Sequence, residues 1–117
     1  MSISPTIENF TREMPAYQDL ITETAGRVLT ETDLNHLILV DSGSAQTMTI
    51  PADSTENLPN GFTVALCRYG SGTLSVAGEA GVTVNSRGGL LDVWNQYGTV
   101  SATKVGADEW LLVGELA

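Results

Sequence analysis

The chain has 117 residues, enough for one domain with a single hydrophobic core. Its 42% hydrophobic content argues against overall disorder, and no apolar run approaches the roughly 20 residues that a bilayer-spanning helix needs. With 14 acidic and 5 basic residues the formal net charge is -9, so we expect no binding to nucleic acid or to anionic membranes. The scattered acids indicate either a solvated surface or a surface complementary to a basic protein.

Residues 1–25 differ from the remainder and are interpreted as an N-terminal arm, followed by a β domain over residues 26–117. The arm contains Pro5 and Pro15 and shows no strand-like alternation. Because Pro15 prevents one continuous helix, we expect an extended segment up to this proline and one short amphipathic helix within residues 16–24. The apolar residues of the arm pack either on their own β domain or on a partner, which makes them the candidate contact residues: Ile3, Pro5, Ile7, Phe10, Met14 and Tyr17.

The start of the chain also bears on where the protein is made. Its first 15 residues have no apolar core flanked by positive charge, so we expect no secretory signal peptide. The single cysteine, Cys67, cannot form an internal disulfide. Both features favour synthesis in a reducing cytoplasm.

Short segments with alternating apolar and polar residues follow the arm and predict an all-β fold. The spacing of Thr30 and Asp33 predicts a capping box with one helical turn, and the continuous apolar run 36–40 indicates a strand covered on both faces. Turn residues separate the segments, and Tyr69–Gly72 is interpreted as a hairpin-type connection. This rhythm is typical of a small antiparallel β-sandwich or barrel-like domain. Strands are expected over residues 27–29, 36–40, 46–50, 62–68, 73–77, 82–84, 90–94, 99–105 and 109–113.

We find no catalytic, cofactor-binding or metal-binding pattern in the sequence. His36 is the only histidine and has no second ligand at a metal-binding spacing, so a structural role is favoured. Cys67 alternates with core positions, which favours a buried thiol over a nucleophile. The segment Gly70–Gly72 lacks the lysine and the following helix of a phosphate-binding loop. We therefore expect a protein without enzyme activity, metal or cofactor.

Three aromatic residues near the C-terminus have two interpretations. Trp94, Tyr97 and Trp110 either fill the core or a subunit interface, or form a platform on which a sugar ring stacks. Aromatic residues of small β domains more often pack in the core or at an interface, so the first interpretation is favoured.

The order of elements from Arg27 to the C-terminus resembles that of small β domains in tailed-bacteriophage virion proteins. The segments that carry the resemblance most clearly are Thr49–Pro51, Gly81–Asn85 and Trp110–Gly114. Domains of this kind occur in head decoration proteins, head fibres and tail fibres. The resemblance implies a homotrimer without enzyme activity.

Within this family the resemblance implies a decoration or cement protein, because the β domain directly follows a short arm and no fibre shaft repeat is present. The expected partner is the major capsid protein, and the expected location is the outer capsid surface of the virion. A fibre tip that binds a host receptor or glycan is the alternative. An enzyme accessory module is a third interpretation.

Overall fold

The computed structural model describes residues 19–117, so the candidate contact residues Ile3 to Tyr17 lie outside the described residues. The described part consists mainly of short β-strands joined by turns, with two 3₁₀ turns. Its elements are β1 (Leu20–Glu23), η1 (Glu31–Asp33), β2 (Leu37–Val40), β3 (Gln46–Ile50), β4 (Thr63–Arg68), β5 (Leu74–Gly78), β6 (Thr83–Ser86), η2 (Arg87–Gly89), β7 (Thr99–Gly106) and β8 (Glu109–Gly114).

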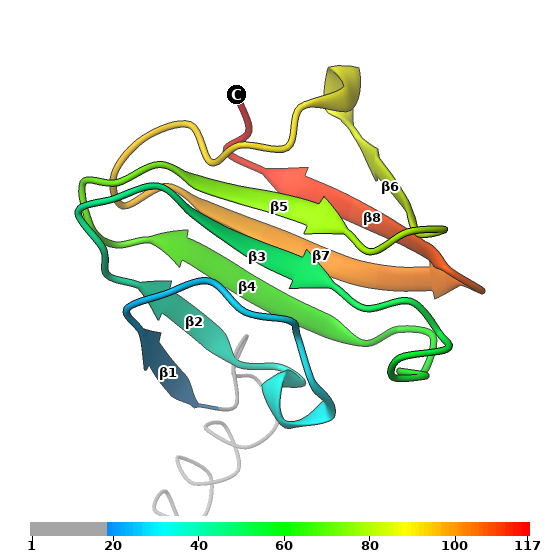
Figure 1. Cartoon of the computed structure of the whole chain (residues 1–117). Coiled ribbons are helices and arrows are strands. Elements are labelled where there is room, and N and C mark those ends of the chain that lie inside the picture. Colours follow the sequence, from blue (N-terminus) through cyan, green and yellow to red (C-terminus); the bar gives the residue numbers. More distant parts are fainter. Residues whose placement is uncertain (1–18) are drawn as a thin grey trace, which may run out of the picture.

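The predicted β-rich fold is confirmed, and the strands form two layers, an arrangement compatible with a β-sandwich. A six-stranded sheet has the order β1-β2-β4-β7-β8-β6, and a two-stranded sheet of β3 and β5 lies across it (Figure 1). The prediction of a purely antiparallel arrangement is wrong. The pairs β1–β2, β2–β4, β3–β5 and β6–β8 are parallel, and only β4–β7 and β7–β8 are antiparallel.

The parallel pairs β2–β4 and β3–β5 arise because the chain winds from one layer to the other. After β2 in the large sheet it enters β3 in the small sheet, returns to β4 and then enters β5. Successive strands of the same layer in this part of the chain therefore pair in parallel, as in the partners Ile38 and Leu66 of the large sheet and Met48 and Val76 of the small one. A parallel pair needs a crossover connection, and for β2–β4 and β3–β5 this crossover passes through the opposite layer, whereas the strand between β6 and β8 is β7 of the same sheet.

The connection after β2 and the connection after β4 lie directly against each other, which corrects the interpretation of Tyr69–Gly72 as a hairpin. The backbone N–H of Gly72 donates to the carbonyl oxygen of Ser42 over 2.8 Å. A Cβ at Gly70 would lie 2.3 Å from the Ser42 carbonyl oxygen, and one at Gly72 would lie 2.1 Å from that of Ser44. Glycine is needed because the backbones approach too closely for any side chain.

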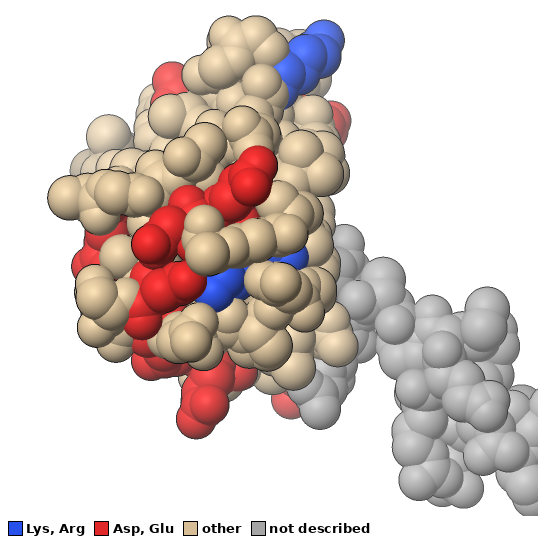
Figure 2. Space-filling model, turned by 90° about the vertical axis from the view of Figure 1, so that its right-hand side faces the viewer, with Lys and Arg blue, Asp and Glu red and all other residues tan. Residues whose placement is uncertain are grey.

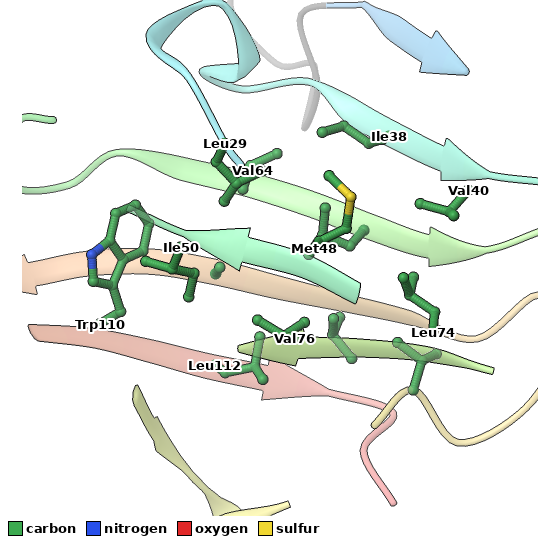
Figure 3. Close-up of a cluster of buried hydrophobic side chains, with 14 of the residues drawn as sticks. Leu29, Ile38, Val40, Met48, Ile50, Val64, Leu74, Val76, Trp110 and Leu112 are labelled. Carbon is green, nitrogen blue, oxygen red and sulfur yellow. The ribbon is translucent and has the colours of Figure 1, made fainter. Parts of the chain in front are cut away.

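The hydrophobic core fills the space between the layers (Figure 3). Alternate residues of each strand supply it, as period-two alternation requires. Phe62 and Trp110 pack edge to face, with ring centroids 5.7 Å apart. The core consists of Leu29, Ile38, Val40, Met48, Ile50, Leu58, Phe62, Val64, Leu66, Leu74, Val76, Val93, Val100, Ala102, Trp110, Leu112 and Leu116.

Three expected elements differ in the structure. The described part of the expected helix 16–24 contains the strand β1, because its backbone pairs in parallel with β2. The expected strand 27–29 is reduced to one bridge between Val28 and Thr49. The expected strand 90–94 consists of two isolated bridges to different partners, at Asp92 and Val93, so it belongs to neither sheet as a regular strand.

Candidate functional site

The predicted structural roles of His36 and Cys67 agree with their positions. The Nδ1 atom of His36 lies 2.8 Å from the carbonyl oxygen of Leu34. Cys67 is 6% exposed within β4. Within residues 19–117, no group of three or more His, Cys, Asp or Glu side chains is arranged to hold a metal ion. In the same range, no helix has the length and hydropathy needed to cross a membrane.

Acidic side chains gather at the end of the sandwich that carries the β7–β8 turn and the loop after β3 (Figure 2). Lys104, only 3% exposed, lies among them. Its ammonium donates to Asp53 Oδ1 over 2.6 Å, to Asn57 Oδ1 over 3.1 Å and to the Leu58 carbonyl oxygen over 2.6 Å. Asp53 and Asp108 each accept a bond from the other's backbone N–H. This network fastens a loop to a turn, which is a structural role.

A second buried charge is the carboxylate of Asp33 in η1. The Asp33 carboxylate is fully buried and accepts two bonds from the Arg27 guanidinium, each 2.8 Å long. It also accepts the Thr30 N–H over 2.8 Å, which confirms the predicted return contact of the capping box. Hydrogen bonding to Asp33 raises the pKa of Arg27 beyond its ordinary value, against the lowering effect of burial. Arg27 also pairs with Glu23 over 2.6 Å, so this cluster ties β1 to η1.

The aromatic candidates separate into different environments. Trp110 is 1% exposed in the core, so it is removed from the set that could contact a ligand or a neighbouring subunit. Tyr97 is 65% exposed and packs edge to face on Tyr69, with centroids 5.5 Å apart. Trp94 is 63% exposed and lines a different feature, an open pocket of about 330 Å³ shared with Arg87, Glu115 and Leu116. Tyr97 does not line this pocket together with Trp94.

The surface that sequence reasoning missed is the face of the six-stranded sheet turned away from β3 and β5. Paired residues share a face, so the register Leu20, Leu37, Ala65, Ser101 and Val113 forms one row across five strands. Two further rows lie beside it. We call the whole surface the outer sheet face: Leu20, Thr22, Leu37, Leu39, Thr63, Ala65, Cys67, Thr99, Ser101, Thr103, Leu111 and Val113.

The outer sheet face is uncharged although the chain is strongly acidic. Leu20, Leu111 and Val113 are 59%, 42% and 48% exposed. The nearest charges in the same alternation lie at the margin: Asp41, which follows Leu39, and Glu109, which precedes Leu111 and accepts a bond from Asn85. Apolar residues exposed together on one face of a protein mark a contact surface more often than scattered ones do.

Two sequence signals point to this face. The runs Leu37–Val40 and Trp110–Val113 are apolar without a break, whereas a strand with one solvated face alternates. The structure covers one face of each run with the core, and leaves the other face as part of the outer sheet face. The missed signal is therefore the lack of alternation itself.

Comparison of the chain with protein-family models, with curated proteins and with solved structures finds no match.

Proposed function

We propose that the chain is a structural virion protein, a decoration or cement protein that binds the outer surface of an assembled phage head as a homotrimer. The observation that carries the proposal is the outer sheet face, an uncharged and partly apolar surface on an otherwise acidic domain. Such a surface suits assembly with other proteins. The resemblance of the chain from Arg27 onward to phage virion domains favours a virion as this assembly.

The stabilising effect follows from selective binding. A protein that binds the assembled shell, and not its free subunits, shifts the equilibrium towards the assembled shell by mass action. The apolar arm residues Ile7, Phe10 and Met14 supply the contact with the major capsid protein. Three arms held in one trimer bind with a high effective concentration, so weak single contacts add up to stable attachment.

The test is cosedimentation of the full chain with capsids assembled from the major capsid protein of the phage that encodes it. The variant replaces Ile7, Phe10 and Met14 by serine. A matched control replaces the polar arm residues Thr6, Asn9 and Thr11 by serine. We expect the first variant to stay in the supernatant and the control to sediment with the capsids. Equal cosedimentation of both variants would contradict the role of the arm.

A fibre tip that binds glycans is the second candidate, and Trp94 is the observation that favours it. Its exposed indole borders an open pocket with the opposite charges of Arg87 and Glu115, a combination that suits a sugar ring and its hydroxyl groups. Glycan-array binding by the full chain would be lost in Trp94→Ala and largely retained in Trp94→Phe, which keeps an aromatic ring. No binding by the unmodified chain would remove this candidate.

A further inference from the structure

We propose that the outer sheet face is the surface through which copies of this chain bind one another. The inference deepens the proposed homotrimer and relies on it for the number of copies alone. Its occupant is a second copy of the chain, as the charge, the shape and the polar groups of the face indicate.

The charge distribution favours a second copy as the occupant. Each copy carries a formal net charge of -9, so two copies repel each other wherever their acidic surfaces meet. Acidic side chains gather at one end of the sandwich (Figure 2), whereas the outer sheet face has none. A basic partner would find no carboxylate to pair with on this face. A like-charged copy, in contrast, meets the least repulsion there.

The shape of the outer sheet face also favours a second copy. Leu20, Leu37 and Leu39 stand on β1 and β2 at one side of the face, and Val113 stands on β8 at the other. Between them β4 and β7 carry small side chains such as Ala65, which is only 3% exposed beside its larger neighbours. The leucine side of one copy therefore fits the low centre of the next. A surface that holds two different halves of one contact binds the next copy head to tail, and such contacts close into a ring when the rotation between copies allows it.

Two polar side chains of the outer sheet face already have hydrogen-bond partners within the same chain. Burying a hydroxyl costs free energy unless it keeps a hydrogen-bond partner. The hydroxyls of Thr63 and Thr103 lie 3.0 Å apart and bond to each other within one chain. The Thr63 hydroxyl also reaches the carbonyl oxygen of Gly61 over 3.1 Å. These two hydroxyls keep their partners when a second copy covers them, so their burial does not carry that cost.

The experiment measures the mass of the full chain by sedimentation equilibrium at low and high salt. A trimer would have three times the 12.4 kDa of one chain. The variant Val113→Asp puts a charge on a side chain that is 48% exposed, and the matched control is Val28→Asp, at a 36% exposed valine that bridges to the small sheet. Circular dichroism spectra verify that both variants fold.

We expect Val113→Asp to weaken self-association by at least about tenfold, because like charges would face each other in the contact, and Val28→Asp to leave it unchanged. Added salt should strengthen self-association of the unmodified chain, since it screens the repulsion between copies. A monomeric unmodified chain, or an oligomer that persists in Val113→Asp, would overturn the proposal. A dimer that Val113→Asp dissociates would support the face and contradict only the trimer of the proposed function. Capsid binding is measured separately, so its failure leaves this result unaffected.

Discussion

The ammonium of Lys104 lies 2.6 Å from the carboxylate of Asp53 and joins two segments that are 51 residues apart in the sequence. Lys104 is the only lysine of the chain, and its side chain is almost completely buried. A buried ammonium is stable only when acceptors replace its water, and here two side chains and one carbonyl oxygen do so. The pair holds the long loop between β3 and β4 against β7.

Replacing Lys104 by methionine keeps the length of the side chain and removes its charge. We expect the free energy of unfolding to fall by about 2 kcal/mol, because the Leu58 carbonyl oxygen loses its partner and the half-buried Asp53 carboxylate loses its counterion. Urea unfolding followed by circular dichroism measures the change. Arg87→Met makes the same change of charge at an exposed position and should alter stability by no more than about 0.5 kcal/mol. Equal effects would show that net charge, and not the buried contact, matters.

The stacked turns predict opposite outcomes for two glycines. Gly72→Ala should lower the free energy of unfolding by about 2–3 kcal/mol, since the new Cβ would meet the backbone of Ser44. Gly43→Ala should be neutral or slightly stabilising, because the nearest atom to its Cβ would be Ser71 Oγ at 3.9 Å. Thermal unfolding of both variants at one scan rate compares them. A stable Gly72→Ala variant would mean that the turns do not stack this closely.

The two tryptophans are expected to differ in fluorescence. In Trp94→Phe the remaining indole, Trp110, lies in the core and should emit at short wavelength with little quenching by iodide. In Trp110→Phe the remaining Trp94 is 63% exposed and should emit at longer wavelength with strong quenching. Steady-state spectra at increasing iodide concentration provide the measurement. Similar quenching in both variants would contradict the placement of Trp110 in the core.

Glu79 predicts a pH dependence at acid pH. Hydrogen bonds from the Ala52 backbone N–H and from the Thr55 side chain hold the pKa of Glu79 below its ordinary value. A carboxyl whose folded pKa is depressed stabilises the fold above its unfolded pKa, and this contribution disappears as the pH falls through the folded pKa. Titration by NMR should show the low pKa directly.

A matched pair of variants tests the same prediction on stability. In Glu79→Gln the free energy of unfolding should fall less steeply between neutral and acid pH than in the unmodified chain. Glu31→Gln, at an exposed residue of η1, should leave the slope unchanged. An unchanged slope in Glu79→Gln, together with an ordinary pKa by NMR, would contradict the role of this hydrogen bond.

Local alternation predicted where strands run but not how they pair. Gln46–Ile50 was expected as a strand and has those bounds in the structure, because Met48 and Ile50 face the core while their neighbours face away. The same alternation serves parallel and antiparallel partners, so the direction of pairing could not follow from it. Likewise, glycine is needed at position 72 because a Cβ there would meet the backbone of Ser44. Ser44 belongs to the connection after β2, and no local sequence pattern relates it to Gly72.

The candidate contact residues show the same limit. Trp94 and Trp110 both stand in short segments with a strand-like sequence, so the local pattern does not distinguish them. The position of Trp110 within β8 turns its side chain towards the core. Leu37 and Leu39 belong to a run that predicted cover on both faces of its strand. The core covers one face, whereas the described residues leave the other face half-buried. The sequence thus indicated that a second cover was needed without identifying the occupant.

The winding of the chain between layers has a consequence for how it folds. Within residues 19–117 the only adjacent strands joined by a tight turn are β7 and β8, through Ala107 and Asp108. Pairs such as Ile38 with Leu66 and Met48 with Val76 form only after a long loop has closed and an intervening strand has found the opposite layer. Loop closure on this scale costs entropy before any contact compensates it, so folding in milliseconds to seconds is expected. We expect the β7–β8 hairpin to form first, because its paired residues are close in the sequence.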